Sequence, residues 1–133
     1  MVITDESAAR RAEIVQTSAS TRGWIGVDLD GTLAEYHGFE GHDKIGKPIK
    51  KMVDRVNLWL DDGALVKIFT ARAAEPDPKR RVETLQAIAE WSLDVFGTAL
   101  PVTCIKDYGM VNLWDDRCVQ VIPNTGERVD GKE

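Results

Sequence analysis

Four groups of polar residues in this sequence each follow a short apolar run, and their side chains are of the types that handle metal ions and phosphate. In chain order the groups are Asp28 with Asp30, Thr70, Lys106, and Asp115 with Asp116. Several carboxylates at one place repel one another unless a cation lies between them. Oxygen ligands without histidine or cysteine favour a hard ion, and a few carboxylates with open positions suit Mg²⁺. We therefore expect Mg²⁺ as the cofactor.

The same residues can carry out phosphoryl transfer. A carboxylate beside a cation, Asp28, can attack phosphorus and form an aspartyl-phosphate. Asp30, two residues further on, can protonate the leaving oxygen and later take a proton from water. Gly31 permits a tight departure of the backbone. Thr70 offers a hydroxyl to the phosphate, and Lys106 offers a positive charge.

Short apolar runs predict the strands that position these groups. We expect strands over 24–27, 65–69, 101–105, 111–114 and 118–122. Such runs are typical of parallel strands buried on both faces. In an open parallel sheet the carboxyl ends of the strands lie along one edge, where ligands bind. The polar groups are therefore expected to converge at that edge.

Two helices are predicted between the strands. Pro48 opens the first and Gly63 follows its end, with an apolar face of Ile49, Met52, Val53, Val56 and Leu60. Asp77 caps the second and Gly97 stops it, with a stripe of Val82, Leu85, Ala89, Ser92 and Phe96. Alternating strands and helices predict an α/β fold, a three-layer Rossmann-like parallel sheet with helices on both faces.

The 133 residues suit one domain. We assign 1–22 to an N-terminal leader with a possible helix over 8–15, 23–122 to the catalytic domain, and 123–133 to a polar, frayed tail. The net charge of −5 argues against non-specific nucleic-acid binding. No apolar run reaches membrane-spanning length and no signal peptide is evident, so we expect a cytoplasmic protein. Cys104 and Cys118 are expected to be free thiols in buried strands.

The sequence resembles the haloacid-dehalogenase-like (HAD) superfamily over about residues 23 to 122. The resemblance is carried by three segments at predicted strand ends, Asp28-Leu29-Asp30-Gly31-Thr32-Leu33, Phe69-Thr70-Ala71-Arg72 and Trp114-Asp115-Asp116-Arg117. It implies that Asp28 is the nucleophile and Asp30 the general acid and base. It also implies a phosphate site at Thr70, Ala71, Arg72 and Gly31, and magnesium ligands at Asp28, Asp30 (through its backbone carbonyl), Asp115 and Asp116.

The basic residue of the family's third motif is harder to place. Lys106 lies only nine residues before Asp115, a shorter spacing than in many members. Its position at a predicted strand end makes it our choice, with Arg72 and Lys79 as substitutes. Arg117 is expected to be mainly structural.

The chain has no room for a cap domain, only for a flap over 35–47, so the site should be open. The segments are also similar to the phosphatase half of polynucleotide kinase/phosphatase enzymes, which suggests a polynucleotide 3′-phosphatase activity as an alternative, with nucleic-acid ends beside phosphorylated small molecules as substrates. A second subunit could cover an open site, so a homodimer is one expected arrangement. His37 and His42 of the flap are either solvated or contact the leaving group.

The expected function is therefore that of a Mg²⁺-dependent phosphatase whose substrate the sequence does not identify. A calcium loop is excluded because Phe39, rather than glutamate, stands at the twelfth position from Asp28. A non-catalytic binding or regulatory protein of the same fold stays open as an alternative. Dehalogenation is disfavoured because halide departure needs no magnesium.

Overall fold

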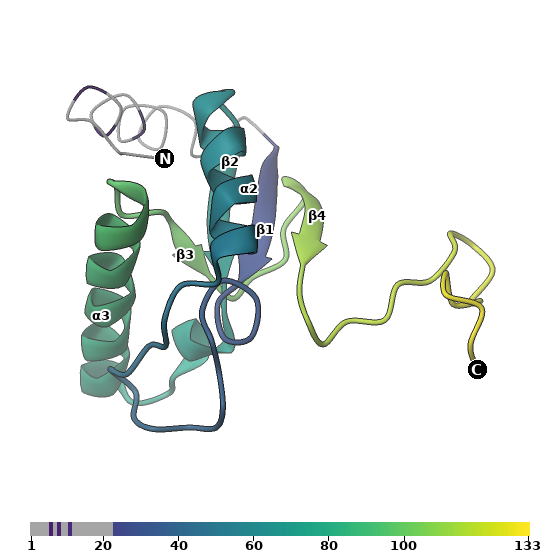
Figure 1. The fold of residues 1–133 in the computed structure, drawn as a ribbon. Coiled ribbons are helices and arrows are strands. Elements are labelled where there is room, and N and C mark those ends of the chain that lie inside the picture. Colours follow the sequence, from purple (N-terminus) through teal and green to yellow (C-terminus); the bar gives the residue numbers. More distant parts are fainter. Residues whose placement is uncertain (1–5, 7, 9–10, 12–22) are drawn as a thin grey trace.

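Four parallel strands form one sheet in the order β3-β2-β1-β4 (Figure 1). The computed structural model describes Glu6, Ala8, Arg11 and residues 23–133. The strands are β1 (Trp24–Asp28), β2 (Leu65–Phe69), β3 (Val102–Thr103) and β4 (Met110–Trp114). The predicted α/β fold with a parallel sheet is confirmed, but the third strand is shorter than predicted and stops well before Lys106.

Both predicted helices form. They are α2 (Lys50–Asp61) and α3 (Pro78–Phe96), and the short 3₁₀ helix η1 (Ala71–Ala74) follows β2. Asp77 caps α3 by accepting a hydrogen bond from the Arg80 amide, and Gly97 ends it with φ 75°. The predicted apolar stripe of α3 is wrong at Val82, which is exposed. The helix instead buries a row with i, i+4 spacing, namely Thr84, Ile88, Ser92 and Phe96.

Both helices pack on the same face of the sheet. Val27, Val66 and Ile68 point to this face and share one core cluster with Val56 of α2 and Ile88 of α3. Among the described helices none lies on the opposite face, so the predicted arrangement of three layers is not seen in this part of the chain.

The connection from β3 to β4 contains no helix that could cover this second face. Residues 104–109 link the two parallel strands, a length too short for the usual helical crossover. Asp107 in this connection accepts a hydrogen bond from the Trp24 indole nitrogen at 2.8 Å. Trp24 and Val27 point to opposite faces of the sheet, and Val27 faces the helices. The connection, which contacts Trp24, therefore lies on the face away from the helices.

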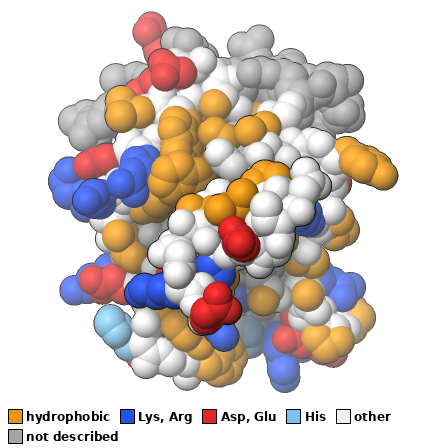
Figure 2. All heavy atoms as spheres, turned by 90° about the vertical axis from the view of Figure 1, so that its right-hand side faces the viewer, with side chains coloured by type: hydrophobic (Ala, Val, Ile, Leu, Met, Phe, Trp, Pro, Cys, Tyr) orange, Lys and Arg blue, Asp and Glu red, His pale blue; other side chains and the backbone are white. Residues whose placement is uncertain are grey.

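The predicted fifth strand over 118–122 is wrong. This segment runs away from the sheet (Figure 1) and folds back locally, through hydrogen bonds from Ile122 N–H to Glu127 O and from Val129 N–H to Gln120 O. The predicted tail boundary at residue 122 falls inside this turn. Figure 2 shows hydrophobic side chains on the face that carries β4 and the C-terminal segment, where Val111, Val119 and Val121 are exposed.

The predicted helix over 8–15 lies mostly outside the described residues. Of the residues given to the leader, Arg11 is buried and donates hydrogen bonds to the Asn57 side chain and the Phe96 carbonyl, on α2 and α3. In the described part of the chain, no helix is long and apolar enough to cross a membrane. Both cysteines are free, as predicted, but neither lies in a buried strand, because Cys104 follows β3 and is partly buried and Cys118 is exposed.

Candidate active site

The carboxyl ends of the strands meet around an open cavity of about 700 Å³, which we call the carboxylate cavity. The register pairs Val27 of β1 with Trp114 of β4, so the next residues, Asp28 and Asp115, lie side by side. Together with Asp116 they form a group of three carboxylates, whose ligand atoms all lie within 4.8 Å of one another. A donor set made only of carboxylate oxygens fits a hard divalent cation such as Mg²⁺.

The charged form of the Asp28 carboxyl is disfavoured in this group. Its pKa is raised from 3.8 to about 7, chiefly by burial and further by the neighbouring Asp115 and Asp116 carboxylates. A hydrogen bond from the Thr32 hydroxyl acts in the opposite direction. A cation among these carboxylates would remove the repulsion, so the electrostatics fit the same metal site as the geometry does.

Thr32 belongs to the first motif, but its type and spacing alone predict no role for it. Its hydroxyl lies 3.3 Å from Asp28 Oδ2 and 3.2 Å from Asp116 Oδ1, and it accepts a hydrogen bond from the Asp116 amide. Thr32 thus links the first and last strand-end groups. Its position four residues after Asp28, in a tight loop, is the feature of the sequence that could have indicated this contact.

Gly31 does not take the predicted position of a phosphate ligand. Its amide donates to the Ala34 carbonyl at 2.8 Å, and it does not line the carboxylate cavity. Its φ is +90°, and a side chain here would collide with the Asp116 carboxylate. Glycine is therefore required so that the loop can turn and Asp116 can approach the backbone.

Thr70 and Ala71 line the carboxylate cavity, as the sequence predicts. Thr70 is almost fully buried, and its hydroxyl oxygen accepts a hydrogen bond from the Arg72 amide at the start of η1. A hydroxyl that accepts one bond still has its proton to donate. Thr70 can therefore donate to an oxygen of a phosphate that lies next to Asp28.

Arg72 is held in an ion pair with Asp30. Its Nε lies 2.7 Å from Asp30 Oδ2 and its Nη2 lies 2.9 Å from Oδ1. The same guanidinium donates to the carbonyls of His42 and Lys44, at 3.2 and 2.8 Å. One side chain from η1 therefore binds both Asp30 and the loop over 35–47.

That loop, the flap (residues 35–47), is fastened at several further points. Glu35 donates its amide to the Lys47 carbonyl, which closes the loop at its base. The Trp91 indole on α3 donates to the Gly46 carbonyl at 3.0 Å, and His42 pairs with Glu83, also on α3. The flap predicted from the sequence is thus a loop anchored on α3.

Lys106 was predicted to supply a positive charge to the site, but its side chain does not line the carboxylate cavity. Because β3 ends at Thr103, Lys106 lies in the exposed connection rather than at a strand end. Arg117 lines the cavity instead and is the one basic residue that does so in the described part of the chain. Arg117 therefore has the better position for contact with a phosphate.

Replacing Asp28 with asparagine is expected to stabilise the metal-free protein near pH 8 by about 1–3 kcal/mol. The folded-state pKa near 7 lies above the ordinary value of 3.8, so wild type loses stability as the pH rises from about 4 to about 7. Above that range the loss is complete, and the amide does not suffer it. Partial solvent exposure of Asp28 holds the gain below the roughly 4 kcal/mol of the full shift.

Thermal unfolding in EDTA, near pH 4 and near pH 8, measures this effect. The variant should melt higher than wild type near pH 8, and the difference should shrink near pH 4. Asp94→Asn, an exposed aspartate on α3, is the matched control and should melt as wild type does at both values. An equal gain at both pH values would contradict the electrostatic explanation.

Comparison of the chain with protein-family models, with curated proteins and with solved structures found no match. The site alone therefore bears on the function of this protein. Its informative features are the three carboxylates, the buried Thr70 hydroxyl beside them, and the ion pair that joins Asp30 to the residue that binds the flap.

Proposed function

We propose that this protein is a Mg²⁺-dependent phosphomonoester hydrolase that acts through an aspartyl-phosphate on Asp28, within the HAD-like superfamily. The observation that carries the proposal is the group of three carboxylates, Asp28, Asp115 and Asp116, at the carboxyl edge of a parallel sheet. Thr70 in the same cavity supports a phosphate site next to this group.

The three carboxylates would hold the ion, and bound Mg²⁺ would offset the negative charges of the phosphate and of Asp28. The chain's own residues orient the reactants. Thr32 fixes the Asp28 carboxylate through its hydroxyl, and Thr70 and Arg117 face the cavity where the phosphate would lie. Because Thr32 contacts Oδ2, Oδ1 of Asp28 is the oxygen that would approach phosphorus.

The reaction then has two steps. An oxygen of Asp28 attacks phosphorus, the bond to the leaving oxygen breaks, and that oxygen takes a proton from Asp30. Water next attacks the phosphorus, gives a proton to Asp30, and releases phosphate and the free Asp28 carboxylate. Each oxygen of Asp30 accepts one hydrogen bond from Arg72 in this structure and keeps a second lone pair, on which it can carry the proton that it exchanges with the substrate.

Release of phosphate from phenyl phosphate is expected to require Mg²⁺ and to stop in EDTA. Asp115→Asn removes one charged ligand of the three and should raise the Mg²⁺ concentration for half-maximal activity by about 10-fold or more. A Mg²⁺ titration of the initial rate measures this shift.

Asp94→Asn serves again as the matched control, because it removes an aspartate charge that does not line the cavity and should leave the titration unchanged. Phosphate release that continues at the same rate in EDTA would contradict the metal requirement. If no phosphate ester is hydrolysed while the protein still binds Mg²⁺, the non-catalytic alternative gains support.

A further inference from the structure

A second cavity, of about 560 Å³, adjoins the carboxylate cavity on the side of the flap. The two cavities share Asp30, Tyr36 and Ala71. A group bonded to a phosphate beside Asp28 would pass Asp30, the proposed proton donor to the leaving oxygen, and enter this second cavity. It therefore lies where the leaving group of the substrate can be accommodated.

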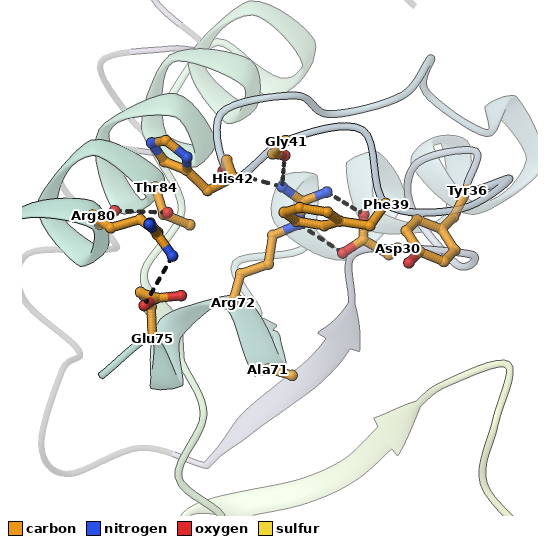
Figure 3. Close-up of a pocket in the computed structure, with 10 residues that line it drawn as sticks. All are labelled: Asp30, Tyr36, Phe39, Gly41, His42, Ala71, Arg72, Glu75, Arg80 and Thr84. Carbon is orange, nitrogen blue, oxygen red and sulfur yellow. Dashed lines mark hydrogen bonds and ion pairs between the residues drawn. The ribbon is translucent and has the colours of Figure 1, made fainter. Parts of the chain in front are cut away.

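Ring-bearing side chains of the flap line this second cavity. Figure 3 shows Tyr36 and Phe39 at the end near Asp30, with Arg80 and Thr84 of α3 at the other end. The Phe39 side chain is 73% exposed and Tyr36 is 47% exposed. Two large rings left open to solvent at the mouth of one cavity offer faces on which a flat group can stack.

The formal charges of the second cavity balance one another. Asp30 pairs with Arg72, Glu75 lies 4.0 Å from Arg80, and a ring nitrogen of His42 lies 2.8 Å from Glu83. Among the residues that line this cavity, the two acidic side chains match the two arginines in number. A second phosphate or carboxylate on the substrate would meet no net positive charge here, so this cavity favours an uncharged group.

We infer that the second cavity binds the leaving group of the substrate, and that this group carries a flat, uncharged ring such as a nucleobase or a phenyl ring. The inference rests on the proposed phosphatase function and adds the substrate class to it. The cavity volume falls within the range of small-molecule sites. Stacking of a base on an aromatic side chain strengthens binding about 10-fold or more and tolerates different rings.

The test compares kcat/KM for adenosine monophosphate and phenyl phosphate, which carry a ring, with that for glycerol phosphate, which does not. Wild type is expected to prefer the ring substrates by about 10-fold or more. Phe39→Ala should lower the ratio of the two kcat/KM values by about 10-fold, mainly through KM. Tyr108→Ala, an exposed ring outside both cavities, is the matched control and should keep the ratio of wild type.

The outcomes separate the two sources of a flat ring. A higher kcat/KM for the nucleotide than for phenyl phosphate indicates a nucleobase, and equal values indicate any flat ring. A ratio that Phe39→Ala leaves unchanged, or a wild type that prefers glycerol phosphate, would overturn the inference.

Failure of the proposed function can be told apart from failure of the inference. If no ester is hydrolysed, the phosphatase assignment fails, and calorimetric binding of adenosine monophosphate and phenyl phosphate decides the inference alone. Binding to wild type that weakens in Phe39→Ala and not in Tyr108→Ala supports it. Absent binding, or equal binding to all three proteins, refutes it.

Discussion

Asp28→Asn is expected to lower kcat for phenyl phosphate by at least about 10³-fold. The amide has nearly the shape of the carboxylate but no charged oxygen with which to attack phosphorus. It can still accept the hydrogen bond from Thr32, and it can donate to the neighbouring carboxylates of Asp115 and Asp116. The fold should therefore survive while the covalent step is lost.

Trapping of the phosphorylated protein tests the same step directly. Wild type mixed with radioactively labelled phosphate ester and quenched in acid should carry label on the protein, since an acyl phosphate survives acid. Hydroxylamine should release this label. Asp28→Asn should carry none, and Asp94→Asn should label as wild type does. Unchanged turnover or unchanged labelling in Asp28→Asn would exclude Asp28 as the nucleophile.

The second large effect is expected from Arg72→Ala, which should lower the free energy of unfolding by about 2–4 kcal/mol. The Arg72 side chain is only 12% exposed. Its loss leaves the Asp30 carboxylate without its cation and leaves the flap carbonyls of His42 and Lys44 without their donor. Urea unfolding measures the stability, and limited proteolysis of residues 35–47 measures the opening of the flap.

Arg80→Ala is the matched control for this loss. Arg80 lines the same second cavity, but its side chain is 57% exposed and its ion pair with Glu75 is 4.0 Å long. Its removal should cost less than about 1 kcal/mol and should not speed cleavage of the flap. Equal losses in the two variants would show that the Asp30 pair does not hold the flap in place.

Much of the fold could be predicted from local pattern. β2 forms over the predicted residues and α3 begins after its predicted cap Asp77, whereas α2 begins at Lys50 rather than at Pro48 and has no side-chain cap. Caps and turns act through hydrogen bonds between residues a few positions apart, so their effect is visible in the sequence. The predicted strand at 118–122 failed because an apolar run has strand propensity without having a neighbouring strand to pair with.

The pairing of long charged side chains could not be predicted in the same way. Arg72 and Asp30 are 42 positions apart, and no local pattern in either segment indicates that the two side chains form a pair. Lys106 looked like a strand-end residue only as long as β3 was taken to reach 105. Arg117, expected to be structural, lines the carboxylate cavity in its place.

The sequence by itself determined which residues lie at the carboxyl ends of β1, β2 and β4, because each of these three apolar runs stops where a polar group begins. It thereby determined that Asp28, Thr70 and Asp115 share one edge of the sheet. Only the tertiary structure decided which side chains meet across that edge, and that Arg72 holds Asp30 under the flap. The position of these strand ends follows from local pattern. A contact between distant side chains depends instead on the register and packing of the whole sheet.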